Sequence, residues 1–183
     1  MAPRPRREWP AGFNQARVRH AAGLLLIFPI DGDAHIVLTV RADNVRHGGQ
    51  VSLPGGVAEP GETYEQAALR EALEEVALAP ETVHVLGALT SLDIPVSGFR
   101  LHPIVGASEE RPVLAPADDE VARILEVRVA DLCDRSHRSS IAIARDGQRV
   151  VAPAFRIGGV DIWGATAMVL AEFLVVAGWV PDK

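Results

Sequence analysis

Apolar residues along the chain fall into short runs and into longer stretches of helical period, and these two patterns predict the elements. Short runs rich in β-branched residues predict strands at 20–28 and 35–40, on either side of the turn sequence IDGD. Further runs of the same kind predict strands at 83–92, 100–107, 121–129, 140–144 and 150–157.

Two longer segments predict helices. Thr63 and Gln66 match a T-x-x-Q capping box at the start of a helix over 63–78, and Pro80 follows its end. The second helix is predicted at 164–178, with an apolar face that must be buried. Since strands outnumber helices, and one helix fits each face of a sheet, the predicted fold class is α/β with a mixed β-sheet between helices.

Length and charge change this picture only at the N-terminus. A chain of 183 residues with 48% apolar content suits one domain, predicted at 20–183. Residues 1–19 are predicted to be a flexible, basic arm, because five arginines lie within the first twenty residues: Arg4, Arg6, Arg7, Arg17 and Arg19. The net charge of −6 argues against a broad nucleic-acid-binding surface.

Cysteine usage and hydropathy indicate the compartment. Cys133 is the single cysteine, so no internal disulfide forms, which suits a reducing cytoplasm. The N-terminus lacks the apolar core of a signal peptide, and the longest apolar stretch, 165–180, is interrupted by Glu172. We therefore predict a cytoplasmic protein with no membrane partner. The sequence leaves a homodimer open as well as a monomer.

The predicted helix 63–78 carries candidate metal ligands. Glu71, Glu74 and Glu75 share one helix face, where like charges repel by roughly 0.2–0.5 kcal/mol per pair and the C-terminal end of the helix dipole disfavours acids. A solvated acidic face is one interpretation. The other is a site for Mg²⁺ or Mn²⁺, since a hard divalent cation prefers carboxylate oxygens and offsets both penalties.

The wider window GVAEPGETYEQAALREALEEVAL, from Gly56, closely resembles the Nudix box, in which glycine, glutamate and an Arg-Glu…Glu-Glu group occur at fixed spacing. Six specified positions coincide by chance about once in 10⁷ starting points at average composition. The six that match are Gly56, Glu62, Arg70, Glu71, Glu74 and Glu75. Ala77 stands where the motif has glycine, and Ala72 is small for a bulky position.

This resemblance implies an α/β/α sandwich fold and a metal-dependent hydrolase that cleaves a diphosphate linked to another moiety. It implies that Glu71, Glu74 and Glu75 bind Mg²⁺ or Mn²⁺, with the carbonyl of Gly55 as a further ligand. Arg70 is expected to orient Glu71, and Glu62 to support the site from outside the ligand set. A metal-bound water then supplies the nucleophile, and a nearby carboxylate accepts its proton.

The segment LTVRADNVRHGGQVSLPGG, residues 38–56, resembles the element that precedes this box in coenzyme A pyrophosphatases. Arg41 and Arg46 match two of its arginines, which have phosphates of coenzyme A as targets; surface ion pairs are the alternative. The expected reaction is hydrolysis of coenzyme A or a derivative to phosphopantetheine and 3′,5′-ADP. ADP-ribose or another nucleoside diphosphate derivative is the alternative substrate, and a non-catalytic Nudix-fold binding module is the alternative of another class.

One further acid is a candidate distal base. Glu120 lies in the segment PADDEVARIL, where a loop carboxylate near the metal would reach the attacking water. A solvated surface acid is the alternative interpretation for Glu120, as it is for Asp118 and Asp119.

Overall fold

The computed structural model of the protein describes residues 9, 11–43, 48–145 and 148–179. The strands of this part are β1 (Arg19–Ile30), β2 (Asp33–Arg41), β3 (Val51–Ser52), β4 (Gly55–Val57), β5 (His84–Ala88), β6 (Leu92–Ile94), β7 (Phe99–Ala107), β8 (Val121–Arg128), β9 (Arg138–Arg145), β10 (Gln148–Ile157) and β11 (Val160–Trp163). The α-helices are α1 (Tyr64–Val76), α2 (Val129–Cys133) and α3 (Gly164–Val176).

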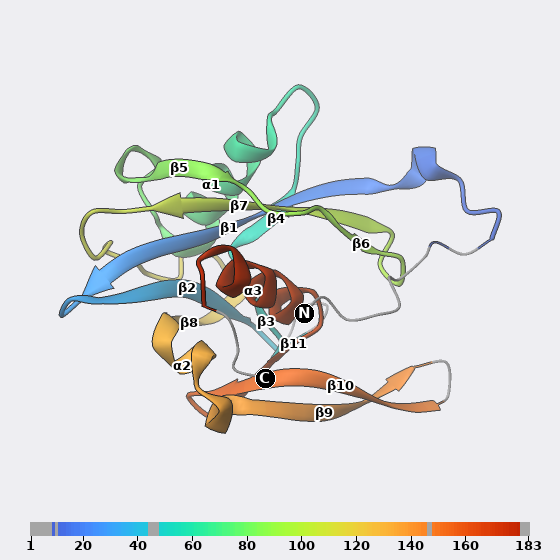
Figure 1. The fold of residues 1–183 in the computed structure, drawn as a ribbon. Coiled ribbons are helices and arrows are strands. Elements are labelled where there is room, and N and C mark those ends of the chain that lie inside the picture. The colour runs from blue at the N-terminus through green and yellow to red at the C-terminus, as the bar shows by residue number, and fades with distance from the viewer. Residues whose placement is uncertain (1–8, 10, 44–47, 146–147, 180–183) are drawn as a thin grey trace.

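A mixed sheet of eight strands, β1 to β8, forms the centre of the molecule (Figure 1). Its middle strand, β1, pairs in parallel with β7 and antiparallel with β2. The predicted α/β class with a mixed sheet is therefore confirmed. The predicted strands at 140–144 and 150–157 lie outside this sheet: they are β9 and β10, which form a separate antiparallel sheet with β11.

The short helix α2, which the sequence patterns did not predict, accounts for this second sheet. It begins directly after the edge strand β8, and its residues Val129 and Leu132 are buried in the core. The chain turns away from the edge of the large sheet there, and β9 then pairs with the following strand, from Arg145 opposite Gln148 to Arg138 opposite Phe155.

The two longer helices cover opposite faces of the large sheet. Alternate residues of β1 face opposite sides, so Leu24 and Leu26 pack with Ala68 and Ala72 of α1, whereas Leu25 packs in the cluster that holds α3. Figure 1 shows α3 in front of the sheet. This arrangement is the α/β/α sandwich that the sequence predicted.

The large sheet is split between β1 and β2. The two strands pair from Ile27 opposite Ile36 to their shared turn, and beyond that point other strands take the facing positions. β3 pairs with the far end of β2, and β4 pairs with the start of β1. At the end of β2 the Arg41 N–H donates to the Gln50 carbonyl at 3.0 Å, and the Gly49 N–H donates to the Arg41 carbonyl at 2.9 Å. Segment 51–57 thus fills the split and lies beside α1.

Helix α1 begins where the capping pattern predicted. The Thr63 hydroxyl accepts from the Gln66 N–H, and the Gln66 side chain accepts from the Thr63 N–H, which completes the capping box. The helix ends at Val76 rather than residue 78, because Ala77 adopts a left-handed conformation with φ of 55°. This helix carries all the glutamates of the predicted metal site.

The predicted strand at 83–92 corresponds to β5, which ends at Ala88; β6 begins only at Leu92, and both strands pair with β7. Their ladder is interrupted opposite Pro103, which has no N–H to donate, and a register shift lies between Val85 and Gly87. The predicted helix at 164–178 is α3, and it ends at Val176.

Of the predicted N-terminal arm, residues 1–8 and 10 lie outside the described residues. In its described part, Gln15–Arg17 form a 3₁₀ turn and Arg19 already belongs to β1. The Arg19 guanidinium lies 3.9 Å from the centre of the Phe99 ring. Within the described part of the chain, the helices are all too short or too polar to cross a membrane.

Candidate active site

Two adjacent glycines bring the backbone of β4 close to its neighbours. A Cβ atom on Gly56 would lie 2.5 Å from the carboxylate atoms of Glu71. A Cβ atom on Gly55 would lie 2.3 Å from the Ala22 carbonyl oxygen of β1. Gly55 thus permits β4 to pair with β1. Gly56 leaves room for the Glu71 carboxylate of α1 against the backbone of β4.

The Arg70 guanidinium connects three glutamates. Its Nε and Nη2 atoms donate to the two Glu62 carboxylate oxygens at 2.9 and 3.2 Å. Its Nη1 atom donates to Glu71 and to Glu74, at 3.0 Å each, and Nη2 also donates to the Val57 carbonyl at 3.1 Å. The hydrogen bond from Arg70 lowers the pKa of Glu62. Arg70 therefore joins the helix to β4 and sets the orientation of Glu71.

Glu75 is the most deeply buried of the three predicted metal ligands. Its exposed fraction is 6%, whereas the Glu74 side chain is 56% exposed. Burial raises the pKa of Glu75 to about 8, although the Gly55 N–H donates to its carboxylate at 3.4 Å and the Arg41 charge also favours the anion. Burial also raises the pKa of Glu71, against the opposing hydrogen bond from Arg70.

These carboxylates suit a hard divalent cation. The charged forms of Glu71 and Glu75 are both disfavoured by burial, and a cation beside them would offset that penalty. Within the described ranges, however, the acidic, histidine and cysteine side chains do not converge in any group of three able to hold a metal ion. Arg70 draws two of the glutamates toward itself, and Glu75 points to Gly55.

The structure brings together two residues that the sequence treated separately. Arg41, at the end of β2, donates from Nη2 to the Glu120 carboxylate at 2.7 Å. The Ala42 N–H also donates to the Glu120 carbonyl at 2.8 Å. The other predicted substrate ligand, Arg46, lies outside the described residues.

Loop 115–120, next to this ion pair, lies along the end of α1. The Ala115 N–H donates to the Val76 carbonyl and the Ala117 N–H to the Glu75 carbonyl, each at 3.1 Å. The Asp118 carboxylate accepts from the N–H groups of Glu120 and the next residue, at 3.0 and 3.2 Å. Sequence reasoning missed Asp118 as a positioning group, although an Asx-type turn before a predicted strand was an available signal.

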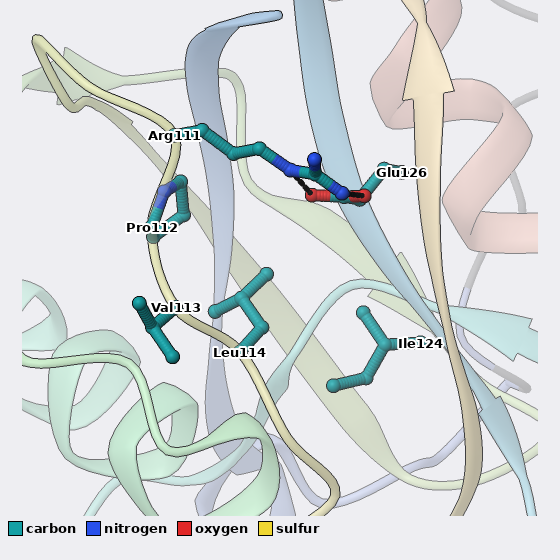
Figure 2. Close-up of a pocket in the computed structure, with 6 residues that line it drawn as sticks. All are labelled: Arg111, Pro112, Val113, Leu114, Ile124 and Glu126. Carbon is teal, nitrogen blue, oxygen red and sulfur yellow. Dashed lines mark hydrogen bonds and ion pairs between the residues drawn. The ribbon is translucent and has the colours of Figure 1, made fainter.

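A separate pocket of about 440 Å³ lies between the loop after β7 and strand β8 (Figure 2). Leu114 and Ile124 face each other across it, and Arg111 donates to Glu126 at 2.9 and 2.6 Å at its rim. The six residues that line it are Arg111, Pro112, Val113, Leu114, Ile124 and Glu126. None of the predicted site residues is among them, so the carboxylate cluster, not this pocket, is the candidate active site.

Comparison with known proteins connects this geometry to a family. Residues 19–145 match the family model described as the NUDIX domain. A protein from Yersinia enterocolitica named as the Nudix hydrolase NudL is 37% identical over 165 residues, which cover 88% of this chain and 82% of the relative. A NudL from Pectobacterium atrosepticum is 37% identical over 139 residues, or 75% of this chain and 72% of the relative.

Solved structures show the same fold. A Nudix hydrolase from M. smegmatis, RenU, matches with a TM-score of 0.65 at 22% identity, covering 90% of this chain and 89% of that one. The NUDIX domain of Shewanella oneidensis NrtR, crystallised with ADP-ribose, matches with a TM-score of 0.51 at 19% identity, covering 69% and 81%.

Proposed function

The chain belongs to the Nudix hydrolase family, and we propose that its substrate is coenzyme A or a derivative, cleaved with the help of Mg²⁺ or Mn²⁺. The family assignment makes the protein a hydrolase that acts on phosphorus anhydrides. In the proposed reaction one water is consumed: its oxygen joins one phosphorus, the bridging oxygen leaves with the other, and the products are phosphopantetheine and 3′,5′-ADP.

The observation that carries this proposal is the pair of carboxylates formed by the partly buried Glu71 and the buried Glu75, beside the Gly55–Gly56 backbone. With Glu74 and the Gly55 carbonyl, these residues would hold the cation. When bound, the cation neutralises phosphate charge and lowers the pKa of a water ligand. Burial makes a charge at Glu75 unfavourable on its own, and a bound cation would compensate that charge, since buried charges in proteins are paired or coordinate metals.

The neighbouring residues act by positioning. Arg70 keeps Glu71 in place by a charge-assisted hydrogen bond, and Glu62 fixes Arg70 through a bidentate pair. The absence of a side chain at Gly56 lets the Glu71 carboxylate reach the loop. Glu120, which the sequence offers either as a distal base or as a solvated surface acid, is paired with Arg41 at 2.7 Å.

The choice of coenzyme A rests on the sequence of segment 38–56 and on Arg41, whose charge lies near the carboxylate cluster. The runner-up is ADP-ribose, and the NrtR domain crystallised with that compound supports this alternative for the fold.

The third possibility is a binding module without catalysis. The complete set of box glutamates argues against it, since their charge repulsion serves no purpose in a module that binds no cation. The single Cys133 supports a cytoplasmic location.

A hydrolysis screen with millimolar Mg²⁺ tests this proposal. Coenzyme A, dephospho-coenzyme A, ADP-ribose and NADH are compared by kcat/KM, and mass spectrometry should find phosphopantetheine and 3′,5′-ADP as the products from coenzyme A. Preferential hydrolysis of ADP-ribose would leave the reaction class but refute the substrate. Hydrolysis of no diphosphate would favour the binding module.

The metal ligands are tested by Glu75→Gln. This variant should lose more than about a hundredfold in kcat, because it lacks a ligand. Wild-type protein should gain thermal stability on addition of Mg²⁺ or Mn²⁺, since a ligand that binds only the folded state stabilises it, and the variant should gain less. Glu126→Gln, at the rim of the separate pocket, is the control and should behave as wild type.

A further inference from the structure

The Arg41–Glu120 ion pair joins the edge of the carboxylate site to the start of β8. The shortest distance, from Arg41 Nη2 to Glu120 Oε2, is 2.7 Å. The Arg41 side chain is mostly covered, with 25% exposed, whereas Glu120 is 53% exposed. Arg41 is therefore packed against its surroundings, and Glu120 extends toward solvent.

Arg41 also lies close enough to Glu75, one of the proposed cation ligands, to affect its charge. Its positive charge favours the anionic form of the buried Glu75, and the negative charge of Asp118 disfavours it. Arg41 thus interacts both with Glu75 of the proposed cation site and with Glu120. A diphosphate bound to a cation at Glu75 would bring a phosphate oxygen to the same guanidinium, because guanidinium pairs with phosphate as readily as with carboxylate.

The backbone on both sides of the ion pair is held by hydrogen bonds, whereas the Glu120 side chain is about half exposed to solvent. The Glu120 carbonyl accepts from the Ala42 N–H, and its own N–H is bound by the Asp118 carboxylate. Rotation of an exposed glutamate side chain into water requires no rearrangement of either strand.

We propose that Glu120 occupies, at Arg41, the place of a substrate phosphate, so that the Arg41–Glu120 bridge opens when a diphosphate binds. This inference rests on the proposed function of the site. It assigns Glu120 a role as a competing anion that weakens substrate binding, in place of the role of general base. Such competition also discriminates between ligands, because a single weak anion displaces Glu120 less readily than a doubly charged phosphate does.

The two roles predict different kinetics for Glu120→Gln. A competing carboxylate reduces the fraction of binding-competent protein, so its removal should lower KM by about two- to fivefold, the range expected for a partly exposed ion pair. The value of kcat should stay within about twofold. A general base would instead give a large loss of kcat, on the order of a hundredfold or more.

Direct binding is measured by calorimetry with α,β-methylene-ADP, a diphosphate that is not hydrolysed, in the presence of Mg²⁺. Glu120→Gln and Glu120→Ala should both bind it about two- to fivefold more tightly than wild type. The matched control is Glu126→Gln, which removes a β8 glutamate from an ion pair with Arg111 and should not change the affinity.

A double-mutant cycle with Arg41→Ala completes the test. In the Arg41→Ala background, Glu120→Gln should no longer increase affinity, because the competition operates only through Arg41. Unchanged affinity in the single Glu120 variants, or a large loss of kcat, overturns the inference while wild-type hydrolysis upholds the proposed function. Wild-type protein that neither binds the analogue nor hydrolyses a diphosphate refutes both.

Discussion

Single residues decide what the site can bind. The sequence predicted that Glu71, Glu74 and Glu75 share a helix face, and the structure places all three on α1. It did not predict their different environments, because exposure depends on parts of the chain distant from the helix. Glu75 is covered next to the Gly55 loop and near loop 115–120, whereas Glu74 extends into solvent beside Arg70. The pairing of Arg41 with Glu120 could not be predicted from the sequence either, since 79 positions separate the two residues.

The two glycines before α1 should respond differently to alanine. Gly56→Ala directs a methyl group against the Glu71 carboxylate, a movable side-chain end, so we expect lost activity with a nearly intact fold. Gly55→Ala directs it against the Ala22 backbone, so the β1–β4 pairing must also shift. Urea unfolding and kcat, measured on both variants, check this. A Gly55→Ala protein as stable as Gly56→Ala would contradict the assigned contacts.

Arg41 should distinguish coenzyme A from its dephosphorylated form if it binds the 3′-phosphate. Its replacement by alanine would then remove a charge-assisted contact worth roughly 1.5–3 kcal/mol, or about ten- to a hundredfold in kcat/KM. Dephospho-coenzyme A lacks that phosphate and should be affected far less. An equal loss for both substrates is the result expected if Arg41 binds the diphosphate, as the inference about the Arg41–Glu120 bridge requires. Arg111→Ala, which disrupts an ion pair at the separate pocket, is the control.

Elements with strong local signals were predicted well. The capping box located the start of α1, and long apolar runs located β1, β2, β7 and β8. The strands missed are short: β3, β4, β6 and β11 have two to four residues, too few to show a period. Their positions depend on pairing with distant strands. Helix α2 was missed because its five residues continue the apolar run of β8.

The end of α1 offers a gain in stability. Ala77 adopts φ of 55° and ψ of 28°, a conformation that is strained for alanine and free of strain for glycine. Ala77→Gly should therefore raise the free energy of unfolding by about 1 kcal/mol in urea titration. The control Ala79→Gly changes a residue at φ of −70° and should not stabilise the protein. Equal effects of the two substitutions would contradict the argument from backbone strain.

At the scale of the whole molecule, the layered arrangement followed from the sequence, and the second sheet did not. The spacing of apolar runs requires a sheet with helices on both faces but leaves open which strands join it. A cluster of three aromatic rings joins α1 to the large sheet. Tyr64 of α1 stacks on His102 of β7 with ring centres 3.6 Å apart, and a ring nitrogen of His20 of β1 lies 2.9 Å from a ring nitrogen of His102.

This cluster makes stability depend on pH. Burial, then repulsion from His20 and Arg100, lowers the pKa of His102 below its ordinary 6.5, against a smaller opposing effect of Asp93. As pH falls through about 6.5, the unfolded chain takes up a proton that the folded chain does not, so stability is lost toward acid pH.

Thermal unfolding midpoints between pH 8 and pH 5 should therefore fall less steeply for His102→Phe than for wild type. The phenyl ring keeps the stacking surface against Tyr64 but cannot titrate. His84→Gln removes an exposed imidazole on β5 and gives the background dependence. A slope for His102→Phe equal to that of wild type would contradict the assignment.

The split between β1 and β2 has a consequence for how such proteins diversify. Segment 42–50 leaves the sheet at Arg41 and returns at Val51, and the Arg41–Gln50 and Gly49–Arg41 backbone hydrogen bonds close it at its base. The Gly55–Gly56 backbone beside the glutamates is anchored separately, by β4 on β1. Insertions or exchanges within this closed segment therefore leave the register of β4 and the placement of the glutamates unchanged. Such changes should therefore alter substrate preference without altering the hydrolytic site.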